Sequence, residues 1–124
     1  MTKKTIYIVE DSEFFSLLLD QQLQETITHN IMDFKSAEEC IAHIREAKAE
    51  PALIILDYQL PGMNGLEALE EIKKLSPKTR VVILSSRMDG ELAVELMKKG
   101  ADDVISKKQG YAEKLIEDID ELVK

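Results

Sequence analysis

Five short runs of apolar and β-branched residues alternate with five helical patterns along this chain of 124 residues. The runs cover residues 5–9, 31–34, 52–56, 80–85 and 103–106, and apolar residues recur at helical spacing after each of them. Strict alternation of strands and helices is typical of a parallel sheet that carries helices on both faces, joined by right-handed crossovers. The chain is therefore predicted to adopt an α/β fold, as one domain over residues 1–124.

Start and stop signals support this division of the chain. Ser12 is predicted to cap the first helix, and Ser36 with Glu39 has the pattern of a capping box at the second. Asp89 is predicted to cap the fourth helix and Gly100 to end it. The apolar positions at helical spacing include Phe14, Phe15, Leu18, Leu19 and Leu23 in the first helix, and Leu92, Ala93, Leu96 and Met97 in the fourth.

The third run, residues 52–56, is apolar throughout and stops at Asp57. An unbroken apolar run suits a strand that is covered on both faces. Asp57 would then lie at the carboxyl end of a central strand, where open α/β sheets bind their ligands. A turn rich in Pro, Gly and Asn follows at residues 61–65. From this stretch alone, the alternative that Asp57 only caps a helix or a turn stays open.

Candidate site residues follow four of the five predicted strands. Glu10 and Asp11 come after the first, Asp57 after the third, Ser85 ends the fourth, and Lys107 follows the fifth. Because the carboxyl ends of parallel strands share one edge of a sheet, these side chains are expected to converge. Each alone has a simpler explanation, as a solvated carboxylate, a turn-forming serine or a surface lysine. Their joint arrival at one edge favours a site.

Three clustered carboxylates repel one another unless a hard cation lies between them, and oxygen ligands suit Mg²⁺. With the cation on Glu10, Asp11 and Asp57, one oxygen of Asp57 is left as a nucleophile. Attack on a phosphoryl group would give an acyl phosphate. Mg²⁺ and Lys107 would neutralise the phosphoryl oxygens, and Ser85 would donate a hydrogen bond to one of them.

The composition disfavours several other classes of function. Acidic residues number 24 against 16 basic ones, a net charge of -8, which disfavours direct nucleic-acid binding and suits a cation or a basic partner. Cys40 is the lone cysteine and is predicted to be a core thiol. His29 and His43 lack partners at zinc-ligand spacing, so each is predicted to be a surface histidine. With no signal peptide and no long apolar span, the chain is predicted to be cytoplasmic, away from the membrane.

Four motifs, in this order along the chain, resemble the receiver domain of two-component response regulators. They are Glu10-Asp11, the run DYQLPGMNG that begins at Asp57, Leu84-Ser85-Ser86, and the run GADDVISK that ends at Lys107. The resemblance covers essentially the whole chain. It implies a flavodoxin-like, doubly wound, five-stranded parallel sheet of strand order 2-1-3-4-5 with five helices.

The resemblance also implies a function. Asp57 takes a phosphoryl group from the phosphohistidine of a histidine kinase or a phosphotransfer protein, without turnover of an external substrate. Mg²⁺ is held by Glu10, Asp11, Asp57 and the Gln59 carbonyl, while Ser85 and Lys107 contact the phosphoryl group. The signal leaves through the face of the fourth helix and fifth strand. A partner protein, a phosphorylation-dependent dimer and a further output domain all stay open as its target.

Departures from the family pattern bear on switching and on phosphoryl lifetime. Val104 stands where the family usually has an aromatic residue, which predicts a weakened or rerouted serine–aromatic switch. Lys108 replaces the proline that usually follows the lysine across a cis bond. A cis bond without proline costs about 3 kcal/mol, so a trans bond is predicted and the placement of Lys107 stays open. Of the two positions that tune lifetime, Gln59 would orient a hydrolytic water and Arg87 would shield the phosphoryl group.

Other functions compete with this one. Val104 and Lys108 suit a pseudo-receiver that binds proteins without being phosphorylated, but the complete acidic pocket argues against it. A phosphatase of the haloacid-dehalogenase kind needs a second acid two residues after its nucleophile, where this chain has Gln59. A flavin or nucleotide site is disfavoured because Glu10 and Asp11 would repel phosphate.

Overall fold

The computed structural model describes residues 4–26, 29–86, 90–108 and 110–123. The five strands form one sheet in the order β2-β1-β3-β4-β5, and all neighbouring strands are parallel. This confirms the predicted strand order and the alternation of strands and helices. The elements in chain order are β1 (Thr5–Val9), α1 (Glu13–Thr26), β2 (Asn30–Phe34), α2 (Ala37–Ala47), β3 (Leu53–Asp57), α3 (Gly65–Leu75), β4 (Arg80–Ser85), α4 (Gly90–Lys98), β5 (Asp103–Ser106) and α5 (Tyr111–Leu122).

The central strand β3 begins and ends one residue later than predicted. Asp57 belongs to the strand because it pairs with Leu84 of β4, and the Tyr58 N–H donates to the Leu84 carbonyl at 2.8 Å. The edge strand β2 begins one residue earlier than predicted, at Asn30. The carboxylate of Asp57 is therefore carried by the sheet itself, which places it more rigidly than a loop would.

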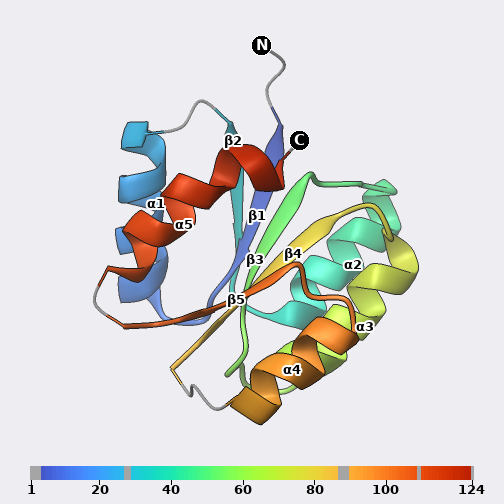
Figure 1. Ribbon diagram of the computed structural model, residues 1–124. Coiled ribbons are helices and arrows are strands. Elements are labelled where there is room, and N and C mark those ends of the chain that lie inside the picture. The colour runs from blue at the N-terminus through green and yellow to red at the C-terminus, as the bar shows by residue number, and fades with distance from the viewer. Residues whose placement is uncertain (1–3, 27–28, 87–89, 109, 124) are drawn as a thin grey trace.

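Both faces of the sheet are covered, and successive residues of the inner strands face opposite layers. In β3, Ile54 and Leu56 pack in one core with α2, α3 and α4, whereas Leu53 and Ile55 pack in a second core with α1 and α5. Figure 1 shows the two layers of helices on opposite sides of the sheet. All five residues of β3 are buried, as the unbroken apolar run predicted for a strand covered on both faces.

The helix caps agree with the sequence in part. Ser36 Oγ accepts the Glu39 N–H at 3.1 Å, but the Glu39 carboxylate accepts the N–H of Lys35, at 3.4 Å, rather than that of Ser36. The predicted capping box at α2 is therefore only half formed. A complete box that was not predicted starts α3. There Asn64 accepts the Glu67 N–H at 3.0 Å, and Glu67 accepts the Asn64 N–H at 3.2 Å. The predicted cap Asp89 lies outside the described residues.

Two helices turn apolar side chains outward. In α1, Leu19 and Leu23 are buried, but Phe14 is 71% exposed. In α4, Leu96 is buried, but Met97 is 48% exposed. In both helices, the apolar residues predicted from helical spacing cover a wider face than the one that the helix buries against the sheet.

Cys40 is buried in α2, which confirms a core thiol, and burial raises the pKa of this thiol to about 12. His43 on the same helix is only half-exposed rather than a plain surface residue. Its ring lies 5.6 Å from the ring of Tyr7 and 5.5 Å from that of Phe34, between centroids. His43 therefore extends the core outward over β1 and β2.

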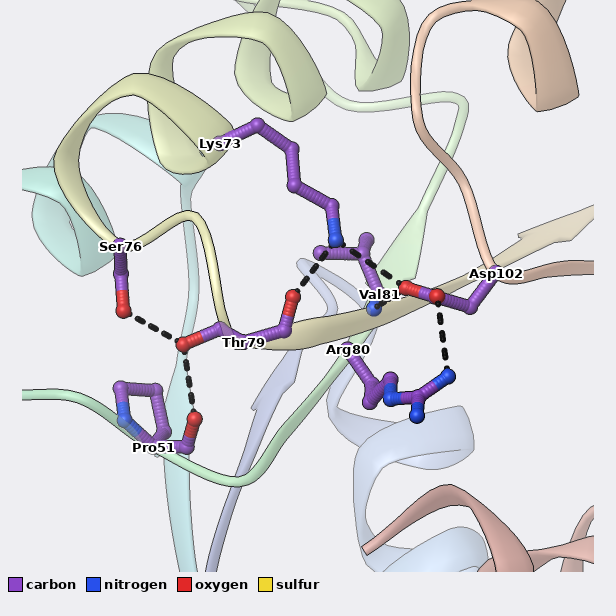
Figure 2. A network of polar contacts seen from close by, with 7 residues as sticks. All are labelled: Pro51, Lys73, Ser76, Thr79, Arg80, Val81 and Asp102. Carbon is purple, nitrogen blue, oxygen red and sulfur yellow. Dashed lines mark hydrogen bonds and ion pairs between the residues drawn. The ribbon is translucent and has the colours of Figure 1, made fainter.

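Polar contacts close the amino edge of the sheet, opposite the ends that carry the candidate residues. Asp102, just before β5, accepts the Val81 N–H at 2.7 Å and pairs with Lys73 at 3.2 Å and with Arg80 at 3.5 Å (Figure 2). Its own N–H donates to the Val81 carbonyl at 2.8 Å. These contacts tie α3 and the start of β4 to the connection between α4 and β5.

A second set of contacts in Figure 2 joins the end of α3 to the connection before β3. The Thr79 hydroxyl donates to the Pro51 carbonyl at 2.7 Å, and it lies 2.6 Å from the Ser76 hydroxyl. Ser76 and Thr79 are both buried, so these hydroxyls satisfy polar groups that water does not reach.

Candidate functional site

The site lies at the carboxyl edge of the sheet, where three inner strands and β5 end. Glu10 and Asp11 follow β1, and Asp57 ends β3. Ser85 ends β4 one residue beyond Leu84, which is the partner of Asp57, and pairs with Ser106 of β5. Parallel register therefore brings together ends that are far apart in the sequence.

Three of these polar residues are buried, which is unusual for their types. Glu10 is 5% exposed, Asp57 3% and Ser85 0%, whereas Asp11 is exposed. Buried carboxylates need a compensating charge or hydrogen bonds. The Glu10 carboxylate accepts the Ser12 N–H at 3.2 Å, and the Asp57 carboxylate accepts the Gln59 N–H at 3.3 Å. Asp57 thus also supports a local turn, so the two interpretations of this residue are compatible.

Lys107 supplies the compensating charge. Its Nζ lies 2.9 Å from Glu10 Oε2 and 3.1 Å from Asp57 Oδ2, and its side chain is 10% exposed. The backbone N–H of Lys107 donates to the Ser85 carbonyl at 2.8 Å, which continues the pairing of β4 with β5. No peptide bond between described residues is cis, so the bond before Lys108 is trans, as predicted. The trans connection therefore still delivers the ammonium group to Asp57.

The surroundings of Asp57 make its carboxyl group harder to ionise than it is in water. Burial, and then the charge of Glu10, raise the pKa of Asp57 from 3.8 to about 6, although Lys107 acts in the opposite direction. For Lys107, burial works to lower the pKa, but the hydrogen bonds and negative charges of Glu10 and Asp57 outweigh it and raise that pKa. Without a further cation, the pocket therefore holds more negative charge than one ammonium group balances.

The acidic residues fit a hard divalent cation. Glu10, Asp11 and Asp57 each offer a carboxylate oxygen, and these oxygens lie within 4.8 Å of one another. Oxygen ligands on a single Mg²⁺ lie at about 2.1 Å from the ion, so ligands on opposite sides are about 4 Å apart. A small adjustment of the side chains would therefore gather them around one ion. Such an ion would also relieve the repulsion that raises the pKa of Asp57.

The connection from β3 to α3 forms the rim of the pocket. The side chain of Gln59 accepts a hydrogen bond from the Ser86 hydroxyl, which joins the segment after β3 to the segment after β4. Glu38 of α2 accepts the Met63 N–H at 3.0 Å and so supports this connection from outside. At Gly65 a Cβ atom would meet the Tyr58 backbone at 2.7 Å, so only glycine fits there. These contacts hold the turn at residues 61–65 in place beside the site.

The structure also places at the site a residue that was predicted only as part of an apolar stripe. The ring of Phe15 lies with its centroid 4.9 Å from Lys107 Nζ. Phe15 lies in the first turn of α1, which begins two residues after Asp11, and this closeness in sequence was the available indication that it would lie near the site. Val104 is half-buried against the core on the side of α2, α3 and α4. Arg87, the second predicted lifetime position, lies outside the described residues.

Chemically, the arrangement suits attack by a carboxylate on an electrophile that carries negative charge. Asp57 offers an oxygen nucleophile, Lys107 is placed beside it to neutralise developing charge, and the acidic cluster provides ligands for a cation. Phosphoryl groups match these requirements because their transfer is driven by positioning and charge neutralisation.

Comparison with known proteins identifies relatives with this architecture. The sequence model described as "Response regulator receiver domain" matches residues 6–120. The chain is 27% identical over 104 residues to a chemotaxis protein CheY of Thermotoga maritima, covering 84% of this chain and 85% of that protein. It covers only 30% or less of the length of several longer curated relatives.

Solved structures agree with this comparison. A signal receiver domain from Vibrio parahaemolyticus superposes with a TM-score of 0.88 at 30% identity, covering 98% of this chain and 91% of that one. The Mn²⁺-bound form of the response regulator Rcp1 superposes with a TM-score of 0.81 at 26% identity, covering 94% and 91%. Across the part of the chain that the structure describes, none of the helices has the length and apolar character needed to cross a membrane.

Proposed function

Since this chain belongs to the response regulator receiver domain family, we propose that Asp57 accepts a phosphoryl group from a histidine kinase or a phosphotransfer protein. The reaction depends on Mg²⁺, and the phosphorylated domain relays the signal by a change of conformation. We take residues 1–124 as one receiver domain. The observation that carries the proposal is the buried Asp57 carboxylate 3.1 Å from the Lys107 ammonium, beside two further carboxylates.

In the proposed transfer, an oxygen of Asp57 attacks the phosphorus of a phosphohistidine. The new O–P bond forms as the P–N bond breaks, and the bonding electron pair leaves with the imidazole nitrogen of the donor. The product is an aspartyl phosphate. Lys107 is placed to contact a phosphoryl oxygen, because its ammonium group already lies beside Asp57. Ser85 is expected to donate a hydrogen bond to another phosphoryl oxygen from the end of β4.

Glu10, Asp11 and Asp57, with the carbonyl of Gln59, would hold the Mg²⁺. The cation, when bound, supplies positive charge that offsets the charge on the phosphoryl oxygens. The response regulator Rcp1, a structural relative, has been solved in an Mn²⁺-bound form, which supports a divalent cation in a domain of this kind. The chain has no acid two residues after Asp57, where Gln59 stands, so we propose that it turns over no external phosphate ester.

We propose that the signal leaves through the face formed by α4 and β5. Val94 and Met97 on α4 are 53% and 48% exposed, so this face offers apolar surface to a partner protein or a second copy. A further domain of a longer protein is another possible target, in keeping with the relatives of which this chain covers less than a third. Because Val104 replaces the usual aromatic residue on β5, the change of conformation is expected to depend more on Ser85 and α4.

Intact-mass measurement tests the proposal. We expect incubation with acetyl phosphate and Mg²⁺ to add the mass of one phosphoryl group to the parent protein. Chelation of the Mg²⁺ should prevent the gain, and Asp57→Asn should abolish it. An unmodified parent protein would favour a phosphorylation-independent binding module, and a phosphorylated Asp57→Asn protein would overturn the assigned site. Turnover of a generic phosphate ester would instead favour a phosphatase.

A further inference from the structure

We propose that Phe15 is a positioning residue, whose ring holds the Lys107 ammonium group beside Asp57 by a cation–π interaction. The inference deepens the proposed function and rests on it, because Lys107 is the group placed to contact the phosphoryl oxygens. It offers a physical reason why a trans bond before Lys108 is compatible with a well-placed lysine.

The geometry supports a direct interaction. Lys107 Nζ lies over the Phe15 ring, 4.9 Å from its centroid, within the range of about 6 Å in which such contacts are favourable. The Lys107 side chain is only 10% exposed, so little water screens the ammonium group. An ammonium group has three N–H donors, and Glu10 and Asp57 accept from two directions. The ring covers a further side of the same group.

The chemistry of the pocket makes the ring contact different from the other two. Glu10 and Asp57 also belong to the acidic cluster that fits a cation, so a bound cation would compete with Lys107 for their oxygens. The face of a phenyl ring has no affinity for a strongly hydrated Mg²⁺ that is already satisfied by oxygen ligands. The contact with Phe15 is therefore one that cation binding leaves in place. It would keep the ammonium group beside Asp57 as its carboxylate partners are drawn away.

Packing alone gives a weaker account of Phe15. Phe15 is 37% exposed, whereas Leu19 and Leu23 bury the inner face of α1. Phe14, the preceding residue, is 71% exposed, and the centroid of its ring lies 5.5 Å from the centroid of the Phe15 ring. A residue that served only to bury apolar surface would tolerate leucine, because leucine is of similar size and fully apolar.

A graded series of side chains at position 15 tests the inference. We expect Phe15→Leu to slow phosphorylation by acetyl phosphate roughly three- to tenfold at saturating Mg²⁺, the worth of one partly shielded cation–π contact. Phe15→Tyr should stay near the parent rate, and Phe15→Trp should match or exceed it, because indole is the strongest partner for a cation. Leu17→Ala is the control and should leave the rate unchanged, because Leu17 is 67% exposed on the same helix. A small donor has no protein surface to dock, so the series reports on the pocket.

A second measurement needs neither phosphorylation nor a metal. In metal-free protein, unfolding of the parent, Phe15→Leu, Lys107→Met and the double variant forms a double-mutant cycle. We expect a coupling of roughly two- to tenfold in the unfolding equilibrium constant between positions 15 and 107. The cycle isolates the contact between the two side chains from the general effect of each change.

Three outcomes would overturn the inference. One is an unchanged rate in Phe15→Leu, another is an equal loss of rate in Phe15→Leu and Phe15→Trp, and the third is the absence of coupling with Lys107. If the parent protein takes up no phosphoryl group, the proposed function fails by itself. The unfolding cycle then still decides whether the ring holds the ammonium group.

Discussion

Replacement of Asp57 by asparagine should stabilise the metal-free protein at neutral pH. Asp57 is 3% exposed, and burial and then the charge of Glu10 raise its pKa from 3.8 to about 6. Each pH unit between these values is worth about 1.4 kcal/mol, so ionised Asp57 costs the folded protein up to about 3 kcal/mol. Asparagine has nearly the same shape as the protonated acid and carries no charge. We therefore expect a gain of about 1–3 kcal/mol at pH 7.

The direction of the pH dependence follows from the raised pKa. The folded protein holds the Asp57 proton more tightly than the unfolded chain, so this group contributes most to stability below about pH 3.8. That contribution falls as the pH rises through about 6, and above this pH the effect of Asp57 on stability no longer changes with pH. The difference in stability between Asp57→Asn and the parent should therefore be small near pH 4, grow up to about pH 6, and then level off.

Thermal or urea unfolding with a chelator present, between about pH 4 and pH 8, measures this difference. For a domain of this size, 1 kcal/mol corresponds to about 4 °C in Tm, so the expected increase is roughly 4–12 °C at neutral pH. Asp120→Asn is the matched control, because Asp120 is exposed on α5 and the change removes the same charge. It should alter stability by less than about 0.5 kcal/mol.

Added Mg²⁺ provides the complementary test. The cation should stabilise the parent protein, since a ligand that binds only the folded state shifts unfolding by mass action. It should stabilise Asp57→Asn much less, because that variant lacks one of the three carboxylates. The reasoning would be refuted if Asp57→Asn destabilised the metal-free protein at neutral pH, or if its effect were the same at pH 4 and pH 8.

Three further predictions address the polar network and the rim of the pocket. Thr79→Val should lower the free energy of unfolding by about 1–3 kcal/mol, because it leaves the buried Pro51 carbonyl without its donor; an unchanged denaturation midpoint would contradict this. Asp102→Asn should cost about 1–2 kcal/mol in the same assay, since it removes both ion pairs of a side chain that is 20% exposed, and no loss would show that the pairs contribute nothing. Ser86→Ala should speed loss of the phosphoryl group roughly threefold, measured by intact mass, because Gln59 Oε1 can then accept a hydrogen bond from an attacking water. Slower loss would count against this prediction, as would an equal effect of Ser86→Ala in a Gln59→Ala background.

Local sequence patterns predicted the elements well where local forces set their ends. The bounds of β4 and β5 agree with residues 80–85 and 103–106 at both ends. The predicted end of β3 was one residue too early. The strand includes Asp57 because Asp57 pairs with Leu84, a contact between segments that are far apart in the sequence. Similarly, Met97 has the spacing of an inward residue, but how far α4 rolls against the sheet decides its exposure.

The sequence by itself determined the order of strands and helices and the chemical character of the site. Alternation of apolar runs with helical patterns leaves few topologies, and a parallel sheet brings its strand ends to one edge. Acidic residues after β1 and at the end of β3, with a lysine after β5, were therefore expected to meet, and Glu10, Asp57 and Lys107 do so.

The tertiary structure alone decided how those groups contact one another. Lys107 and Glu10 are 97 positions apart, and the path of the chain after β5 sets the distance between their charged atoms. The same holds for Phe15 over Lys107 and for Gln59 with Ser86, which join different elements at the carboxyl edge. Periodicity specifies which face of an element a residue occupies, but contacts within a few ångströms depend on how the elements pack together.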